Sequence, residues 1–238
     1  MPEFLVFQVH GPMASWGDIA VGEERPSFGR PTKSAVMGLL AGALGIRRDE
    51  EERHMTLCSS YGLAVKVEAR GLSLIDFHTA QVPPDARDSF FESRREELKE
   101  SKELKTILSR RRYHTDVLYA LCLWPRTVDP PWPMADLAAA LVHPIFTPYL
   151  GRKSCPPALP FHPQVREADT IREAFEAAEF PADCFLDGLP RLEKSEFYWE
   201  EGAPAGLNAV QSFIRRDTVL SRRRWQFEDR IETQGSWS

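Results

Sequence analysis

Apolar residues come in a few short runs along the chain, and most of these runs predict strands. The stretch Glu3–His10 is β-branched and aromatic, which favours a buried strand. Tyr61–Glu68 and Leu72–Phe77 have the same character on either side of Gly71, which predicts two strands with a turn between them. Val117–Trp124 is apolar throughout, as expected for a strand at the centre of a sheet. We therefore expect a sheet at the core of the protein.

Helical segments separate these strands. Thr32 is suited to cap a helix from Lys33 to Leu44. Two short helices are expected at Met134–Val142 and Thr170–Ala178. The charged stretch Asp88–Arg112 has apolar residues that lie only roughly on one stripe, so it predicts a thinly buried helix that projects from the body.

The end of the chain, Val210–Thr233, alternates arginines with apolar residues, a pattern that predicts a basic β-hairpin. The order β-α-β-β, followed by a helix, a strand and another helix, favours an α+β domain of ferredoxin-like or RNA-recognition type. A β-rich C-terminal part would pack beside it. A length of 238 residues is enough for a sizeable core, and no repeat or low-complexity linker divides the chain.

The average charge does not suggest a polyanion as partner, because the formal net charge is -5. Basic residues are nevertheless clustered. Lys105–His114 holds four basic side chains and no acid, and Gly206–Phe227 holds five arginines against one aspartate. Nucleic-acid binding depends on such basic faces rather than on the average.

Cysteines and targeting signals bear on the compartment. The four cysteines are far apart and form no C-x-x-C pair, which indicates reduced thiols rather than a metal or redox site. The N-terminus lacks the basic segment of a signal peptide, and the longest apolar stretch, Ala35–Ile46, is too short to span a bilayer. We expect a cytoplasmic protein with no cofactor and no membrane partner.

Known catalytic motifs for nucleophilic, metal or dinucleotide chemistry are missing from the sequence, and the six histidines show no ligand-like pairing. His114 is nevertheless an acid/base candidate, because it follows Arg110–Arg112 and Tyr113 directly. RNA cleavage through the 2′-hydroxyl needs a base, an acid and cations. With Tyr113 or Lys105 assisting, a metal-independent endonuclease is one hypothesis. A histidine that only makes a local hydrogen bond at the start of a strand is the other.

Separate segments combine glycines, hydroxyls and cations in a way that suits an extended phosphate backbone. The helix start at Thr32 offers free N–H groups, with Lys33 and Ser34 in its first turn. Its spacing departs from the nucleotide loop G-x-x-x-x-G-K-[ST], because Thr32 replaces the last glycine. The loop Gly151–Ser154 would let the backbone approach a ribose-phosphate chain.

Aromatic residues near these segments have two interpretations. Trp16, Tyr113 and Trp225 would stack on unpaired bases if they are exposed, and would be ordinary core residues if they are buried.

Four stretches carry a family resemblance: FQVHGPMASWGDIAVGEERPSFGRPTKSAVMGLLAGALGI (Phe7–Ile46), DFHTAQ (Asp76–Gln81), RRRYHTDVLYALCLWP (Arg110–Pro125) and YLGRKSCP (Tyr149–Pro156). In sequence and order they resemble the CasD-type subunit of type I-E CRISPR Cascade, a family of the RAMP superfamily. Residues Glu167–Leu207 carry no motif of that family.

The resemblance implies a RAMP fold. A ferredoxin-like or RRM-like core would comprise residues 1–81 and 110–160, a helical thumb would be inserted at 82–109, and a β-rich part at 161–238 would pack on the core. It implies a non-catalytic subunit that binds and caps the 5′ handle of the CRISPR RNA (crRNA) in antiviral defence. Such a subunit contacts the backbone and large subunits of the complex and meets target DNA indirectly.

Two other hypotheses stay open. A sister family of type I-C cuts repeat RNA, so an endonuclease that uses His114 is the main alternative. A protein-only adaptor, whose basic patches meet acidic partners, is the third.

On the RNA-binding hypothesis, the helix start at Arg30–Ser34 holds a handle phosphate while Gly151–Ser154 holds neighbouring nucleotides. We do not expect RNA to cross the open sheet face, because the paired aromatic motif of RNA-recognition modules is absent. The residues expected to bind RNA are Ser15, Trp16, Gly17, Arg25, Arg30, Thr32, Lys33, Ser34, His78, Gln81, Arg110, Arg111, Arg112, Tyr113, His114, Gly151, Arg152, Lys153, Ser154, Arg215, Arg216, Arg222, Arg223 and Arg224.

Overall fold

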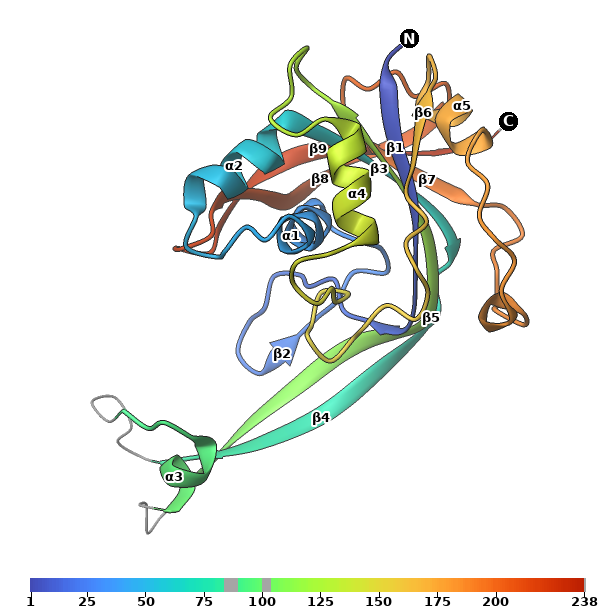
Figure 1. Ribbon diagram of the computed structural model, residues 1–238. Coiled ribbons are helices and arrows are strands. Elements are labelled where there is room, and N and C mark those ends of the chain that lie inside the picture. Colours follow the sequence, from blue (N-terminus) through green and yellow to red (C-terminus); the bar gives the residue numbers. More distant parts are fainter. Residues whose placement is uncertain (84–89, 100–103, 238) are drawn as a thin grey trace.

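One largely antiparallel sheet runs through the molecule in the computed structural model, which describes residues 1–83, 90–99 and 104–237 (Figure 1). Its order is β6-β1-β5-β3-β7-β9-β8, and β2 and β4 pair with β5 outside this path. The strands are β1 (Glu3–Ala14), β2 (Glu24–Arg25), β3 (Tyr61–Ala69), β4 (Leu72–Val82), β5 (Lys105–Pro125), β6 (Gln164–Glu167), β7 (Glu196–Glu200), β8 (Asn208–Ser221) and β9 (Gln226–Ser236). The helices are α1 (Lys33–Ala43), α2 (Glu51–Ser60), α3 (Arg94–Lys99), α4 (Met134–Val142) and α5 (Ile171–Glu176), with a 3-10 turn at Cys184–Leu186.

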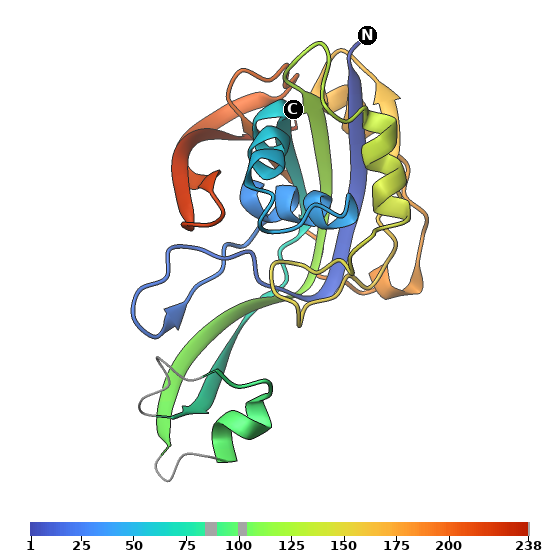
Figure 2. The same cartoon turned by 60° about the vertical axis from the view of Figure 1, so that its left-hand side comes forward.

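Helices cover both faces of the sheet. Helices α1, α2 and α4 lie together over one face, as Figures 1 and 2 show, and enclose the larger apolar core around residues such as Phe7, Tyr119 and Leu121. Helix α5 lies on the other face, over a second core that includes Phe4 and Cys122. Helices and an antiparallel sheet thus share one chain, as expected for the α+β class.

The predicted central strands are confirmed as parts of β1, β3 and β5. Strand β5 lies between the other two and pairs with both. This strand of 21 residues pairs with β1 along one edge and with β3 and then β4 along the other. The turn at Gly71 exists, with φ +68°, and a Cβ there would lie 1.5 Å from the carbonyl oxygen of Thr115. However, β3 and β4 do not pair with each other, because each follows its own stretch of β5.

The helix predicted over Asp88–Arg112 is wrong. Helix α3 covers six residues, and β5 begins at Lys105; residues 88–89 and 100–103 of the predicted helix lie outside the described part of the chain. The predicted apolar stripe was too thin to anchor a long helix. Pairing with β4 from Leu72 to Val82 instead satisfies the backbone of residues 105–115.

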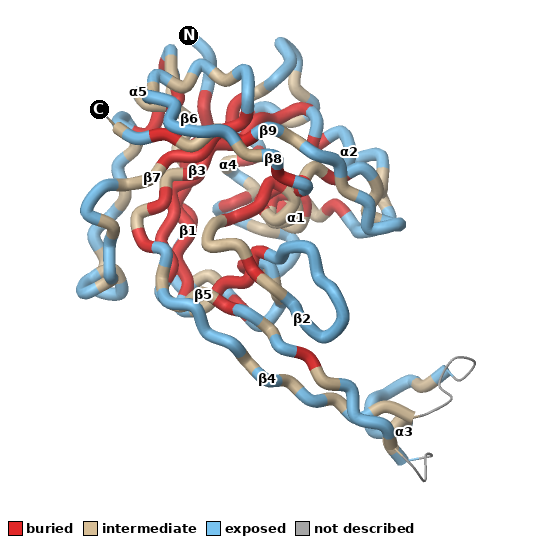
Figure 3. Tube along the Cα trace, turned by 180° about the vertical axis from the view of Figure 1, so that it is seen from behind, coloured by how far each residue is buried: buried red, intermediate tan, exposed pale blue. Residues whose placement is uncertain are grey.

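Strands β4 and β5 leave the body together as a two-stranded arm, defined here as residues 72–82 and 105–115 (Figure 2). Figure 3 shows that the arm is largely exposed or half-buried, whereas the body contains most of the buried residues. Asp116, which has φ +53°, lies where β5 passes from its pairing with β3 to its pairing with β4. This left-handed residue marks the point at which the arm begins.

The predicted helix cap and C-terminal hairpin are both confirmed. The Thr32 side chain accepts a hydrogen bond from the Ala35 N–H at the start of α1. Strands β8 and β9 form the hairpin, which joins the main sheet through pairing of β9 with β7. The two short helices are also present, as α4 and α5. Within the described residues, no helix has the length and apolar character needed to cross a membrane.

A buried charge network fastens this hairpin to the start of α1. The Lys33 backbone N–H donates to Asp217 Oδ2 at 2.9 Å, and Lys33 Nζ lies 2.9 Å from Glu200 Oε2. Arg230 Nε donates to Asp217 Oδ1 at 2.6 Å. The anion at this helix start is therefore a carboxylate of the same chain. The network comprises Arg30, Lys33, Arg126, Glu200, Arg215, Asp217, Arg230 and Glu232.

Charges within the network shift the pKa values of its members. Burial, and then the neighbouring charges of Arg126 and Arg230, lower the pKa of Lys33. Burial acts to raise the pKa of Asp217, but the hydrogen bonds and charge of Arg230, together with the charge of Arg215, outweigh it and hold that pKa below 3.8. The stabilising contribution of the Asp217 carboxylate is therefore complete at pH values above the pKa that this group has in the unfolded chain. It is lost as the pH falls through the lower pKa that the group has in the folded protein.

We predict that Asp217→Ala lowers the free energy of unfolding by about 3–5 kcal/mol, because it leaves buried guanidinium groups and the α1 N-terminus without their anion. Urea denaturation monitored by circular dichroism measures this change. Asp229→Ala is the matched control, since the Asp229–Arg216 pair on the same hairpin is more than half exposed and should cost less than about 1 kcal/mol. Equal losses in the two variants would contradict the prediction.

Candidate nucleic-acid interface

Distant segments of the chain meet at the foot of the arm. Ser15 follows β1, and its N–H donates to Leu150 O at 3.0 Å while its hydroxyl donates to Arg112 O at 2.9 Å. Gly151, at φ +82°, packs so closely that a Cβ there would lie 1.8 Å from the Ser15 carbonyl oxygen. The loop after α4 is thereby held against the ends of β1 and the arm. Glycine is required at position 151 for this contact.

The loop between β1 and α1 is fixed at the same place. The Trp16 N–H donates to Ser27 Oγ at 3.0 Å, and Thr32 Oγ1 donates to Trp16 O at 3.3 Å. The Tyr119 hydroxyl, from the middle of β5, donates to Gly29 O at 2.9 Å. These bonds hold the loop in position beside β5.

Cationic side chains gather on this framework. The Arg152 guanidinium lies 4.7 Å from the centre of the Tyr113 ring, and its Nη2 donates to Arg25 O at 3.4 Å. Arg25 is in β2, which pairs in parallel with residues 110 and 111 of β5. Lys153 is exposed on the adjoining loop. We call this group the arm-base cluster: Gly17, Arg25, Arg110, Arg111, Arg112, Gly151, Arg152, Lys153 and Ser154.

Acidic residues near the arm-base cluster are few. Glu24 lies 3.4 Å from Arg110, in a pair that is more than half exposed on both sides. Within the described residues, Arg25, Arg112, Arg152 and Lys153 have no carboxylate partner within 4.0 Å. The cluster is therefore a cationic patch on a chain whose average charge is negative.

Several predicted RNA contacts are instead buried in the protein. The side chains of Lys33 and Arg215 are each 4% exposed and face carboxylates of the charge network. Arg30 pairs with Glu232 and lies 3.6 Å over the Tyr198 ring. These cations balance internal carboxylates, so they are not surface contacts for a phosphate. This corrects the sequence-based expectation for the three residues.

Two predicted stacking residues are core residues. Trp16 is 7% exposed and packs edge-on against Tyr119, with ring centroids 5.8 Å apart. Tyr113 is also 7% exposed and is covered by Arg152. Trp225, in contrast, is 55% exposed. The core interpretation is therefore correct for Trp16 and Tyr113.

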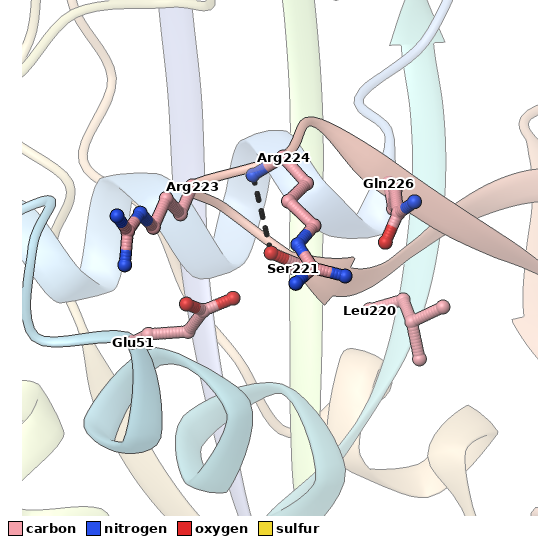
Figure 4. Close-up of a pocket in the computed structure, with 6 residues that line it drawn as sticks. All are labelled: Glu51, Leu220, Ser221, Arg223, Arg224 and Gln226. Carbon is pink, nitrogen blue, oxygen red and sulfur yellow. Dashed lines mark hydrogen bonds between the residues drawn. The ribbon is translucent and has the colours of Figure 1, made fainter.

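The arginines of the β8–β9 turn lie beside α1 and α2 rather than in the arm-base cluster. Arg222 Nη2 donates to Ser34 O at 3.0 Å. Arg223 and Arg224 line a pocket of about 520 Å³ together with Glu51 of α2 (Figure 4). A carboxylate in the wall of this pocket makes it less suited to a phosphate. These turn residues therefore form a separate surface.

The alternative catalytic group is not assembled. His114 Nε2 lies 3.4 Å from Ser27 O, and burial lowers its pKa. Tyr113 and His114 are neighbours on a strand, so their side chains point to opposite faces. Lys105 lies nine residues away on the same strand, which places it roughly 30 Å from His114. These three groups cannot reach one phosphodiester, which corrects the assignment of Tyr113 and Lys105 as partners of His114.

The sequence interpretation missed exposed apolar residues on the arm. Ile75 and Phe77 are each 58% exposed, and Leu72 is 71% exposed. His78 and Gln81, which were expected to bind RNA, lie on the same strand farther along the arm. The sequence could have predicted these exposed residues, because β4 has apolar residues at both odd and even positions. That pattern does not fit a strand with one buried face.

Comparisons with known proteins agree with this architecture. A family model described as CRISPR-associated protein (Cas_Cas5) matches residues 4–230. The chain is 32% identical over 164 residues to the CRISPR system Cascade subunit CasD of Escherichia coli (strain K12), a match that covers 66% of this chain and 68% of that protein.

Solved structures share the fold. One chain, from a "CRISPR RNA-guided surveillance complex", matches with a TM-score of 0.66 and 24% identity, covering 98% of this chain and 89% of that chain. Another, titled "Crystal structure of Cas protein", matches with a TM-score of 0.62 and 24% identity, covering 98% and 94%. The resemblance seen in the sequence is confirmed. The chain belongs to the Cas5 family of CRISPR-associated proteins.

Proposed function

We propose that this protein is a non-catalytic subunit of a type I-E Cascade complex in the cytoplasm, where it binds and caps the 5′ handle of the crRNA. The observation that carries the proposal is the convergence of four segments, distant in sequence, into the arm-base cluster. Family membership supports it, since the E. coli relative is named a Cascade subunit. Backbone N–H groups, glycine and cations together suit a sugar-phosphate chain.

We propose that the arm is the base of the RAMP thumb expected at residues 82–109, and that the rest of the chain is the ferredoxin-like core with a C-terminal part packed on it. Its exposed apolar residues, including Leu72 and Ile107, suit contact with another protein. We propose that the arm engages the backbone subunit, that the body contacts the large subunit, and that target DNA is met indirectly through the complex.

We predict that Arg152→Ala and Lys153→Ala each weaken binding of handle RNA and reduce the slope of log affinity against log salt by roughly 0.7 to 1. Each variant removes one cation from a phosphate contact. Fluorescence anisotropy with labelled handle RNA at several salt concentrations measures the slope. Arg172→Ala on α5, on the opposite face of the sheet, should leave the slope unchanged. An unchanged slope in both cluster variants would show that these side chains do not meet phosphates.

We predict that the purified protein does not cut labelled repeat RNA in EDTA, because His114 lacks an assembled acid and base partner. Gel analysis of the RNA after incubation tests this. A site-specific product that disappears in His114→Ala would favour the endonuclease alternative. A purified complex whose absorbance ratio at 260 and 280 nm shows no nucleic acid would favour the protein-only adaptor.

We predict that deletion of residues 82–109 leaves the body folded but impairs assembly with the backbone subunit. Phe77 is the register partner of Arg110, so residues 78–81 would close the shortened arm with a loop of usual hairpin length. Thermal melting would test the fold, and co-purification with the backbone subunit would test assembly. Normal assembly of the shortened protein would refute the proposed role of the arm.

A further inference from the structure

The two faces of the arm carry different side chains. Residues directly opposite each other in an antiparallel pair share a face. One face carries Phe77 opposite Arg110. On the same face, two residues away on each strand, Ile75 lies opposite Arg112. The pairs of β4 with β5 on this face, here called the arginine face, are Ser73–His114, Ile75–Arg112, Phe77–Arg110, Thr79–Leu108 and Gln81–Thr106.

No acid from β4 or β5 lies on the arginine face, and among the described residues the carboxylate within 4.0 Å of its arginines is Glu24 of β2, 3.4 Å from Arg110. On the other face, Asp76 of β4 lies directly opposite Arg111. That face also carries Lys105 and His78, beside apolar residues such as Leu72 and Leu74. The arginine face differs in having an exposed aromatic ring beside two arginines.

Phe77 is the most exposed aromatic position on this face, at 58%. Its Cβ lies about 5 Å from that of Arg110, its cross-strand partner, and Arg112 is a diagonal neighbour at about 7–8 Å. A large exposed apolar ring costs solvation free energy unless something covers it. Flanking guanidinium groups make a second protein's apolar surface a poor cover, since their charges would be buried. A nucleotide would cover the ring with its base while its flanking phosphates meet the arginines.

The arginine face continues into the arm-base cluster. Arg110 and Arg112 belong to both, and β2 with Arg25 lies along the other edge of β5 at residues 110 and 111. Arg152, which covers Tyr113, lies on the other face of the arm, so an RNA strand bound there would reach the arginine face by passing the edge of β5 at which Arg25 lies.

We propose that the arginine face is a base-stacking platform, in which Phe77 stacks on an unpaired base of the bound RNA while Arg110 and Arg112 hold the flanking phosphates. This inference rests on the proposed RNA-binding function and adds a residue that recognises a base to a site otherwise made of phosphate contacts. Stacking on an aromatic ring tolerates different bases, because every base has a π face. The platform would therefore fix the register of the strand on the arm.

The test uses handle RNA that carries 2-aminopurine at one position at a time, because the fluorescence of this base reports stacking. With the wild-type protein, we expect the signal to change on binding at one position or two adjacent positions. Phe77→Ala and Phe77→Leu should abolish the change there and weaken affinity about tenfold, the order expected for loss of one stacked base. Phe77→Trp should preserve both.

Phe77→Leu is the decisive variant, because it keeps apolar bulk and removes the π system. Wild-type fluorescence and affinity in this variant would overturn the proposal, as would a defect confined to assembly with a partner protein. Leu72→Ala, on the opposite face of the same strand, is the control and should change affinity less than twofold. Thermal melting should be unchanged in every variant, since both side chains are largely exposed. Failure of the wild-type protein to bind handle RNA would instead refute the proposed function itself.

Discussion

The pairing of β5 with four other strands is the constraint on which the rest of the structure depends. Its C-terminal half lies between β1 and β3 in the buried centre of the sheet, and its N-terminal half pairs with β4 in the arm. Because one strand belongs to both parts, the arm is continuous with the core. The arm-base cluster lies where β5 leaves the body, and its position is fixed by the pairing of β2 with β5 and by the bonds of Ser15 to Leu150 and Arg112.

A second constraint decides which cations are available to a ligand. The start of α1 has the N–H groups of an anion site, but Asp217 from the C-terminal hairpin already occupies it, and Glu200 neutralises the Lys33 ammonium. Burying these charges is tolerable because each has a hydrogen-bonded partner. The network thus uses five of the protein's 30 lysines and arginines to hold the hairpin, and the cations of the exposed loops and the arm remain available to a ligand.

Sequence reasoning was reliable for segments whose local pattern and tertiary environment agree. Val117–Trp124 is apolar at both odd and even positions because both faces of that strand are buried, and Thr32 caps α1 as its residue type suggests. The stretch Asp88–Arg112 misled because its Glu, Lys and Arg residues favour a helix locally, whereas pairing with β4 decided the structure of residues 105–112. Trp16 was expected among the RNA contacts because it lies next to glycine-bearing segments, but its side chain packs inward on Tyr119.

By itself, the sequence determined the class of fold, the position of most strands and helices, the family, and some of the segments that gather at the foot of the arm. Periodicity, caps and motifs are local properties, so they can be recognised without coordinates. Only the tertiary structure decided which cation faces solvent and which faces a carboxylate, as the contrast between Lys153 and Lys33 shows. The two partners of Lys33, Glu200 and Asp217, lie 167 and 184 positions farther along the chain. No local sequence pattern predicts a contact over such a separation.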